Sequence, residues 1–159
     1  MLDLCCVLDL IQLGVTVLMF LFILLCILVK LTTSPYPDIK QFEQEKYFKT
    51  SLSGSEKRAF PSLSDPASVN LSVIVPAYNE ELRLPKMLDE CLEFLKKRKT
   101  SYEVIIVDDG SKDKTSETAL KYVDRCGSDA VRVLTLAQNR GKGGAVRMGM
   151  LRARCVFIY

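Results

Sequence analysis

Two neighbouring carboxylates, Asp108 and Asp109, follow directly after the apolar run 104–107. Carboxylate oxygens can accept hydrogen bonds from a base N–H or a ribose hydroxyl, and they can hold a metal ion that is bound to phosphate. An aromatic side chain, Tyr78, follows the apolar run 71–75 in a similar way. Its ring could lie against a base, since every base offers a π face. Together these residue types are suited to bind a nucleotide.

The two apolar runs must be strands if these side chains are to meet. Uninterrupted β-branched runs of this length are typical of strands buried on both faces, as in a parallel sheet under helices. Ligands of open α/β sheets bind at the carboxyl ends of such strands, so both polar clusters should face one crevice. A simpler interpretation is that residues 109–111 form only a turn and that Asp108 is only a helix cap. Two clusters at equivalent strand ends favour the crevice.

The chain from residue 71 onward alternates between strand patterns and helix patterns. Apolar residues recur at helical spacing around Pro85, which is well placed in the first turn of a helix. Gly127 is a typical C-terminal stop for the next helix. This alternation predicts an α/β fold, a Rossmann-like nucleotide-binding half-domain with a mainly parallel sheet. The expected strands are 71–75, 103–107, 131–136 and 156–159, and the expected helices are 84–99, 114–126 and 143–154.

A glycine-rich stretch, residues 139–144, follows the third expected strand and leads into a helix. Glycines allow a ligand to approach the backbone closely, and helix N-termini favour phosphate. Arg140 and Lys142 would add positive charge there. The stretch does not match a P-loop, and a glycine turn alone would mean little. Its place after the third strand supports a position beside a diphosphate.

Three blocks of this sequence, 73–80, 107–115 and 139–147, resemble the opening of a family-2 glycosyltransferase of the GT-A fold in their order and spacing. The resemblance covers about residues 70 to 155. It implies a crevice for a nucleotide sugar, with roles for residues in all three blocks. By this resemblance Pro76, Ala77, Tyr78, Glu80 and Asp109 would line the uridine pocket, Asp108 would support it, and Arg140 and Lys142 would face the phosphates.

The resemblance also implies an activity. Within the family, the blocks and the apolar N-terminus are most similar to membrane enzymes that transfer glucose from UDP-glucose to dolichyl phosphate for protein N-glycosylation, with inversion at the anomeric carbon. The transfer of mannose to the same lipid uses the same motifs and is the alternative reaction. A non-catalytic, membrane-tethered nucleotide-binding fragment is the alternative from another class.

The family's metal site lies beyond the matched blocks. In relatives the fourth strand ends in an Asp-x-Asp motif that holds Mg²⁺ or Mn²⁺ on the diphosphate, and the acceptor site and the catalytic base come later. The sequence stops within the expected fourth strand, 156–159. We therefore expect no metal ligands in this chain and catalytic residues only beyond Tyr159. The domain 71–159 is expected to be a truncated GT-A domain that is inactive alone.

Residues 10–29 are almost entirely apolar. A helix over 11–29 would be roughly 28 Å long, close to the ~30 Å hydrocarbon core of a bilayer. A cleaved signal peptide would need a basic start, a shorter core and a small-residue cleavage site. The chain instead begins with Asp3 and Asp9 and no basic residue, which favours an uncleaved signal-anchor.

The flanking charges predict how this span is oriented. No Lys or Arg precedes it, whereas Lys30, Lys40, Lys46 and Lys49 follow it, and the positive-inside rule then places the C-terminal part in the cytosol. Six cysteines without metal-type spacing fit a reducing compartment. A net charge of +3 does not indicate a nucleic-acid partner. We expect a single-pass protein of the endoplasmic reticulum membrane, with 1–9 luminal, 10–29 spanning, and 30–70 a cytosolic linker rich in proline and serine.

This orientation can be tested with glycosylation tags. A tag inserted after Lys49 should stay unmodified in membranes, and a tag inserted before Asp3 should be modified, because oligosaccharide transfer takes place on the luminal side. The measurement is the gel mobility shift that an endoglycosidase reverses. The opposite pattern would place the domain in the lumen.

Overall fold

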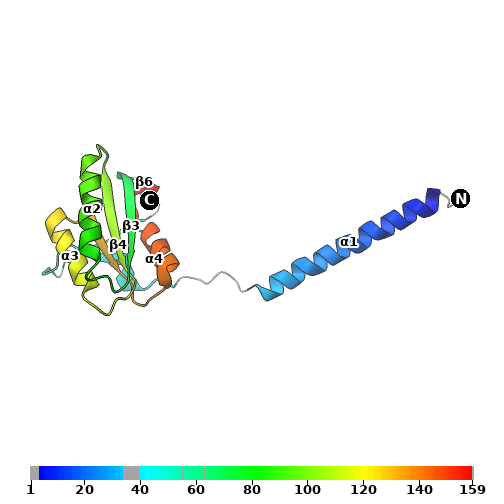
Figure 1. Cartoon of the computed structure of the whole chain (residues 1–159), viewed down its shortest axis with the longest axis horizontal. Coiled ribbons are helices and arrows are strands. Elements are labelled where there is room, and N and C mark those ends of the chain that lie inside the picture. Colours follow the sequence, from blue (N-terminus) through cyan, green and yellow to red (C-terminus); the bar gives the residue numbers. More distant parts are fainter. Residues whose placement is uncertain (1–3, 34–39, 55, 63, 159) are drawn as a thin grey trace. The chain divides into compact units, whose positions relative to one another are not determined.

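The computed structural model describes residues 4–33, 40–54, 56–62 and 64–158. The chain divides into two compact units, Met1–Ile39 and Lys40–Tyr159 (Figure 1). The first unit contains a single described helix, and the second contains every strand that the structure describes.

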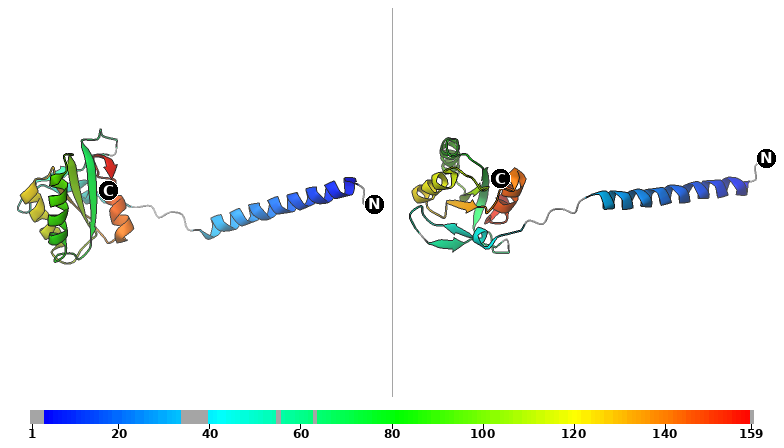
Figure 2. Two further views of the ribbon diagram at one scale, coloured as in Figure 1. Left: turned by 45° about the horizontal axis from the view of Figure 1, so that its top comes forward. Right: turned by 90° about the horizontal axis from the view of Figure 1, so that it is seen from below.

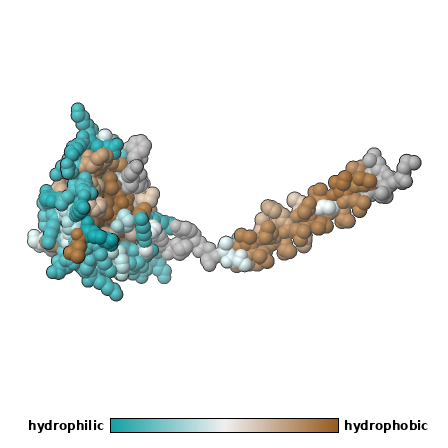
Figure 3. Space-filling model, viewed as in Figure 1, coloured by the Kyte–Doolittle hydropathy of each residue, from teal (hydrophilic) through white to brown (hydrophobic). Residues whose placement is uncertain are grey.

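The helix of the first unit, α1 (Leu4–Thr32), contains the whole of the predicted span 10–29. Its segment Val7–Thr32 has 26 residues and a mean hydropathy of 2.8. Apolar side chains cover the visible side of this helix (Figure 3), and its large apolar residues from Val7 onward are exposed within the chain. By length and composition α1 can cross a membrane.

The second unit is built around a four-stranded sheet with the strand order β5-β4-β3-β6. All three strand pairs are parallel. The predicted α/β fold with a parallel sheet is therefore confirmed. The elements of this unit, in chain order, are η1 (Glu43–Lys46, a 3₁₀ helix), β1 (Tyr47–Lys49), β2 (Lys57–Ala59), β3 (Val69–Ala77), α2 (Leu84–Lys97), β4 (Tyr102–Asp108), α3 (Thr115–Cys126), β5 (Val131–Thr135), α4 (Gly141–Met150) and β6 (Cys155–Ile158).

The helices cover both faces of the sheet, with α2 and α3 on one face and α4 on the other (Figure 2). The apolar residues of α2 repeat at helical spacing, which gives this helix one continuous buried side. They join buried residues of α3, β4 and β5 in a single core. The buried leucines of α2 are Leu84, Leu88, Leu92 and Leu95.

The packing of α4 on the other face depends on Gly149. A Cβ atom at this position would lie 2.5 Å from Cγ2 of Ile74 and 2.9 Å from Cγ2 of Val107. Only glycine lets the helix backbone approach β3 and β4 this closely. This contact fixes α4 over the two strands whose ends carry the polar clusters.

The two strands predicted to be buried on both faces differ in burial. In β4, residues 103–108 are all buried, as expected for a central strand. In β3, residues 73–76 are only half-buried, because β6 pairs with the first part of β3 alone, from Val69 to Ser72. The expectation of full burial is correct for β4 and wrong for the second half of β3.

The interval 30–70, expected to be a linker, contains structured segments in its described part. β1 and β2 form an antiparallel hairpin, and η1 precedes it. Phe48 and Phe60 are both buried, and their ring centroids lie 4.8 Å apart. The two rings therefore pack against each other and against Arg132 of β5, a contact that periodicity does not reveal in strands of three residues.

Beneath the hairpin lies a cluster of buried charges. The Glu103 carboxylate contacts the guanidinium of Arg132 and accepts a hydrogen bond from Nε of Arg154 at 3.0 Å. The Arg132 guanidinium lies 5.5 Å from the ring centroid of Phe48 and 5.7 Å from that of Phe60. Burial lowers the pKa of Arg132 to about 9, and the neighbouring charge of Arg154 acts in the same direction. The hairpin thus covers an ion pair that would otherwise meet water.

The contact at Gly149 can be tested with a matched pair of glycine substitutions in α4. Gly149→Ala should destabilise the domain by about 1–3 kcal/mol, because the added methyl group forces Ile74 and Val107 to move. Gly143→Ala meets no atom within 4 Å and should be neutral or stabilising by up to about 1 kcal/mol through helix propensity. Denaturant unfolding followed by circular dichroism measures both. Equal effects would contradict the close packing of α4.

Candidate nucleotide-binding site

The candidate crevice forms where β3 and β4 end side by side. Their parallel register places Ala77 opposite Asp108, and the Asp109 N–H donates to the Ala77 carbonyl at 2.8 Å. The polar residues that follow each strand therefore start from adjacent positions, as the sequence predicted.

A cavity of about 340 Å³ opens at these strand ends. It brings together residues from all three sequence blocks, including Tyr78, Asp109 and Lys142. Six predicted residues lie in its lining: Pro76, Ala77, Tyr78, Glu80, Asp109 and Lys142. Three further lining residues, Asn139, Gly141 and Ala145, belong to the third block but were not predicted as site residues.

The turn after β3 is tied to the turn after β4 by hydrogen bonds. Asn79 adopts a left-handed backbone, with φ of 54°. Its N–H donates to Oγ of Ser111 at 2.9 Å, and its Oδ1 accepts from the Lys112 N–H at 2.9 Å. The N–H of Glu80 donates to Oγ1 of Thr115 at 2.8 Å. Because Asn tolerates the left-handed region better than most residues, this position suits its side chain, and the two turns form one unit.

Two acidic side chains support this unit from its rim. Glu80 pairs with Arg83 at 2.6 Å. Asp113 accepts hydrogen bonds from the hydroxyl of Thr115 and from the N–H of Glu81. The hydrogen bond from Thr115 lowers the pKa of Asp113. Both carboxylates therefore already have partners in the chain.

Asp109 connects the β4 turn to the glycine-rich loop. Its Oδ1 accepts a hydrogen bond from the Arg140 N–H at 2.8 Å. The following residue, Gly110, has φ of 71°, and a Cβ there would lie 3.1 Å from the backbone nitrogen of Asn139. The loop is therefore pressed against this turn. Within the described residues Oδ2 of Asp109 has no hydrogen bond, so this oxygen can accept one from a ligand.

Asp108 differs from Asp109 because both of its carboxylate oxygens accept hydrogen bonds from within the chain. It is 2% exposed. Its Oδ1 accepts from the Ser111 N–H at 2.9 Å, and its Oδ2 accepts from the hydroxyl of Ser116. Both oxygens are thus directed to the turn and to the start of α3, and the supporting role expected of this residue toward a nucleotide stays a prediction.

The two basic residues of the loop have different surroundings. Lys142 is exposed in the first turn of α4 and lines the cavity. The guanidinium of Arg140, expected to face phosphates, instead contacts Glu45 at 2.9 Å and donates to the Lys40 carbonyl at 2.6 Å. This ion pair holds the Arg140 side chain at 8% exposure. Glu45 lies far from the motifs in sequence, and no pattern there indicated it.

The carboxylates of the crevice do not fit a divalent cation. Among the described residues, no group of three or more His, Cys, Asp or Glu side chains is placed to hold a metal ion. Asp108 uses both oxygens for hydrogen bonds, and Asp109 uses one. We therefore assign no step to a metal here.

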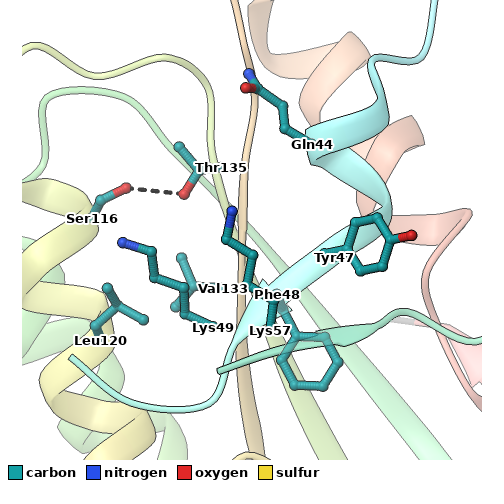
Figure 4. Close-up of a pocket in the computed structure, with 9 residues that line it drawn as sticks. All are labelled: Gln44, Tyr47, Phe48, Lys49, Lys57, Ser116, Leu120, Val133 and Thr135. Atoms are coloured by element: carbon teal, nitrogen blue, oxygen red, sulfur yellow. Dashed lines mark hydrogen bonds between the residues drawn. The ribbon is translucent and has the colours of Figure 1, made fainter. Parts of the chain in front are cut away.

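A second cavity, of about 310 Å³, lies between the β1–β2 hairpin and α3. Figure 4 shows the side chains of Lys49 and Lys57 reaching toward the hydroxyls of Ser116 and Thr135. These two hydroxyls lie 3.2 Å apart. Ser116 also donates to Asp108, so the lining of this cavity is bonded to the end of β4.

A parallel sheet that carries a polar crevice at the carboxyl ends of its strands defines the class of α/β nucleotide-binding domains. The family described as "Glycosyl transferase family 2" matches residues 72–159, which is more than half of the chain. The chain belongs to glycosyltransferase family 2. The predicted family is thereby confirmed.

Several relatives share one description. The chain is 49% identical over 152 residues to dolichyl-phosphate beta-glucosyltransferase of Mus musculus and 46% identical over 152 residues to that of Homo sapiens. Each match covers 92% of this chain and 46% of the relative. It is 54% identical over 132 residues to the Drosophila melanogaster protein of the same name, covering 80% of this chain and 40% of the relative. The chain thus spans about half the length of the curated relatives it matches.

Among solved structures, the chain is similar to a mannosyltransferase from Pyrobaculum calidifontis in complex with GDP-Man and Mn²⁺. The TM-score is 0.42 and the sequence identity is 24%, and the match covers 58% of this chain and 27% of that one.

The division between the two carboxylates can be tested through stability. Asp108→Ala should destabilise the domain by about 1–3 kcal/mol, because it leaves the Ser111 N–H without its acceptor and removes the carboxylate that accepts from the Ser116 hydroxyl. Asp129→Ala removes an exposed carboxylate before β5 and should change stability by less than about 0.5 kcal/mol. Denaturant midpoints compare the two variants. If Asp108→Ala were as mild as its control, the supporting role would be refuted.

Proposed function

We propose that this chain carries the sugar-nucleotide-binding part of a membrane-anchored glucosyltransferase, which moves glucose from UDP-glucose to dolichyl phosphate. The observation that carries the proposal is the single cavity that gathers Tyr78, Asp109 and Lys142 at the ends of β3 and β4. The relatives, all described as dolichyl-phosphate beta-glucosyltransferases, supply the reaction.

Each of these three side chains suits one part of a uridine nucleotide. The ring of Tyr78 is 43% exposed and can stack on the base. The free Oδ2 of Asp109 can accept from the uracil N–H or from a ribose hydroxyl. Lys142 lies at the N-terminal end of α4, where the helix dipole and unpaired N–H groups also favour the diphosphate.

The first unit fits a lipid acceptor. An apolar helix of this length would hold the enzyme at the bilayer that contains dolichyl phosphate. We place it in the endoplasmic reticulum membrane with the domain in the cytosol, since lysines follow the helix and basic residues do not precede it. The soluble sugar nucleotide would then reach the crevice from the cytosol.

Calorimetric titration of the purified full chain in detergent tests this proposal. UDP-glucose and UDP should bind, and GDP-mannose should bind at least tenfold more weakly. A tenfold preference corresponds to a difference of roughly 1.4 kcal/mol in binding free energy. A folded chain that binds no uridine nucleotide, or that prefers GDP-mannose, would overturn the proposal.

Asp109→Asn tests the assignment of the base or ribose contact. The amide can still accept the Arg140 N–H through one oxygen, but it turns the free acceptor into a donor. Loss of a charged hydrogen-bond partner should weaken UDP binding by about 1.5–3 kcal/mol, or roughly 10- to 150-fold. Asp129→Asn, at the opposite edge of the sheet, is the matched control. Unchanged affinity in a folded Asp109→Asn variant would reduce this residue to a turn former.

A further inference from the structure

We propose that Glu45 is a positioning residue for the phosphate side of the crevice, and that the short helix η1 therefore influences the affinity for the nucleotide diphosphate. This inference rests on the proposed function. It concerns a carboxylate outside the three sequence blocks, in the four-residue helix η1.

Glu45 is fully buried, at 0% exposure, although it lies in a short polar segment. Its neighbour in η1, Glu43, has a side chain that is 81% exposed. A carboxylate loses several kcal/mol of hydration when it is buried, so it must be paired and hydrogen-bonded to be tolerated. The burial of Glu45 therefore requires specific partners.

Those partners belong mainly to the glycine-rich loop. Oε1 of Glu45 accepts from the Ala137 N–H at 3.0 Å and from NH2 of Arg140 at 2.9 Å. Oε2 accepts from the same NH2 at 3.0 Å and from the Phe42 N–H at 3.0 Å. The carboxylate thus joins η1 to both ends of the segment 137–140.

The same segment connects directly to the crevice. The backbone N–H of Arg140 donates to Asp109 at 2.8 Å, and the flanking residues Asn139, Gly141 and Lys142 line the cavity. Glu45 therefore fixes the guanidinium of a residue whose backbone is bonded to Asp109. A shift of Arg140 would move the start of α4 and its lysine.

The ion pair also determines which cation faces the phosphates. Glu45 neutralises Arg140 and holds its guanidinium at 8% exposure, so that Lys142 is the exposed cation of the lining. The contact supports the phosphate side of the crevice. The base side is formed by Tyr78 after β3 and by Asp109, whose backbone is held independently of Glu45 by its hydrogen bond to the Ala77 carbonyl. Loss of Glu45 should consequently affect the diphosphate more than the nucleoside.

This difference separates positioning from a purely structural role. A general loss of stability would weaken UDP and uridine alike, whereas a displaced loop weakens UDP alone. Glu45→Gln keeps the shape of the side chain and one acceptor oxygen, but its amide would meet the N–H groups of Arg140 or Phe42 as a second donor. Glu43→Gln is the matched control, because it alters an exposed neighbour in the same short helix.

The experiment measures UDP and uridine binding to the full chain in detergent, by calorimetry and ligand-observed NMR. Glu45→Gln should raise the Kd for UDP fivefold or more, roughly the 1 kcal/mol expected of coupled neighbours, and should leave the Kd for uridine within about twofold of the unaltered chain. Glu43→Gln should change neither. If Glu45→Gln weakened the binding of both ligands equally, or of neither ligand, the positioning role would be overturned.

A double-mutant cycle with Arg140→Gln tests whether Glu45 acts through Arg140. The double variant should bind UDP no more weakly than the weaker single variant, because both changes break one contact. Additive losses would overturn this route. If Glu45→Gln fails to fold, Arg140→Lys takes its place, because it keeps the charge beside Glu45. This variant should weaken the binding of UDP but not that of uridine. Weaker binding of both ligands, or of neither ligand, would again refute the role. An unaltered chain that binds neither ligand would refute the proposed function itself.

Discussion

The parallel pairing of β3 with β4 is the constraint on which the rest of the domain depends. The central strand β4 is fully buried from 103 to 108, so its register is determined by the core on both faces. That register places Ala77 beside Asp108, and the two following turns are then close enough to bond each other. A slip of one residue would turn every side chain of the strand to the other face, and it would also move the polar clusters apart.

Buried charges form a second level of organisation. Glu103 is held by Arg132 and Arg154 under the hairpin, and Glu45 is held by Arg140 beside the loop. Pairs of this kind contribute little net stability, because desolvation offsets their attraction. Breaking one is costly, however, since it leaves a charge buried without a partner. Their effect is therefore to fix where the hairpin and the loop can lie.

Much of the fold and most of the crevice could be predicted from the sequence, because both depend on local patterns. Long apolar runs and helical spacing identify the strands and helices of the sheet, and short motifs at strand ends identify Tyr78, Asp109 and Lys142. The position of Arg140 could not be predicted in this way. Its partner Glu45 lies 95 residues earlier, in a 3₁₀ helix of four residues without periodicity. Charge alone suggested that Arg140 faces phosphates, whereas the structure places its guanidinium in a long-range contact with buried Glu45.

The neighbouring carboxylates show how one dipeptide can support two tasks. Asp108 ends the strand and satisfies the turn and the start of α3 with both oxygens. Asp109 begins the turn, and one of its oxygens accepts a hydrogen bond from the Arg140 backbone. The other oxygen is left for a ligand. Because the turn is already held by Asp108, by Asn79 and by the loop, Asp109 does not have to be ordered when a ligand binds. If the crevice binds a nucleotide as proposed, avoiding that entropic cost favours affinity, because the hydrogen bonds between the loops already hold the turn.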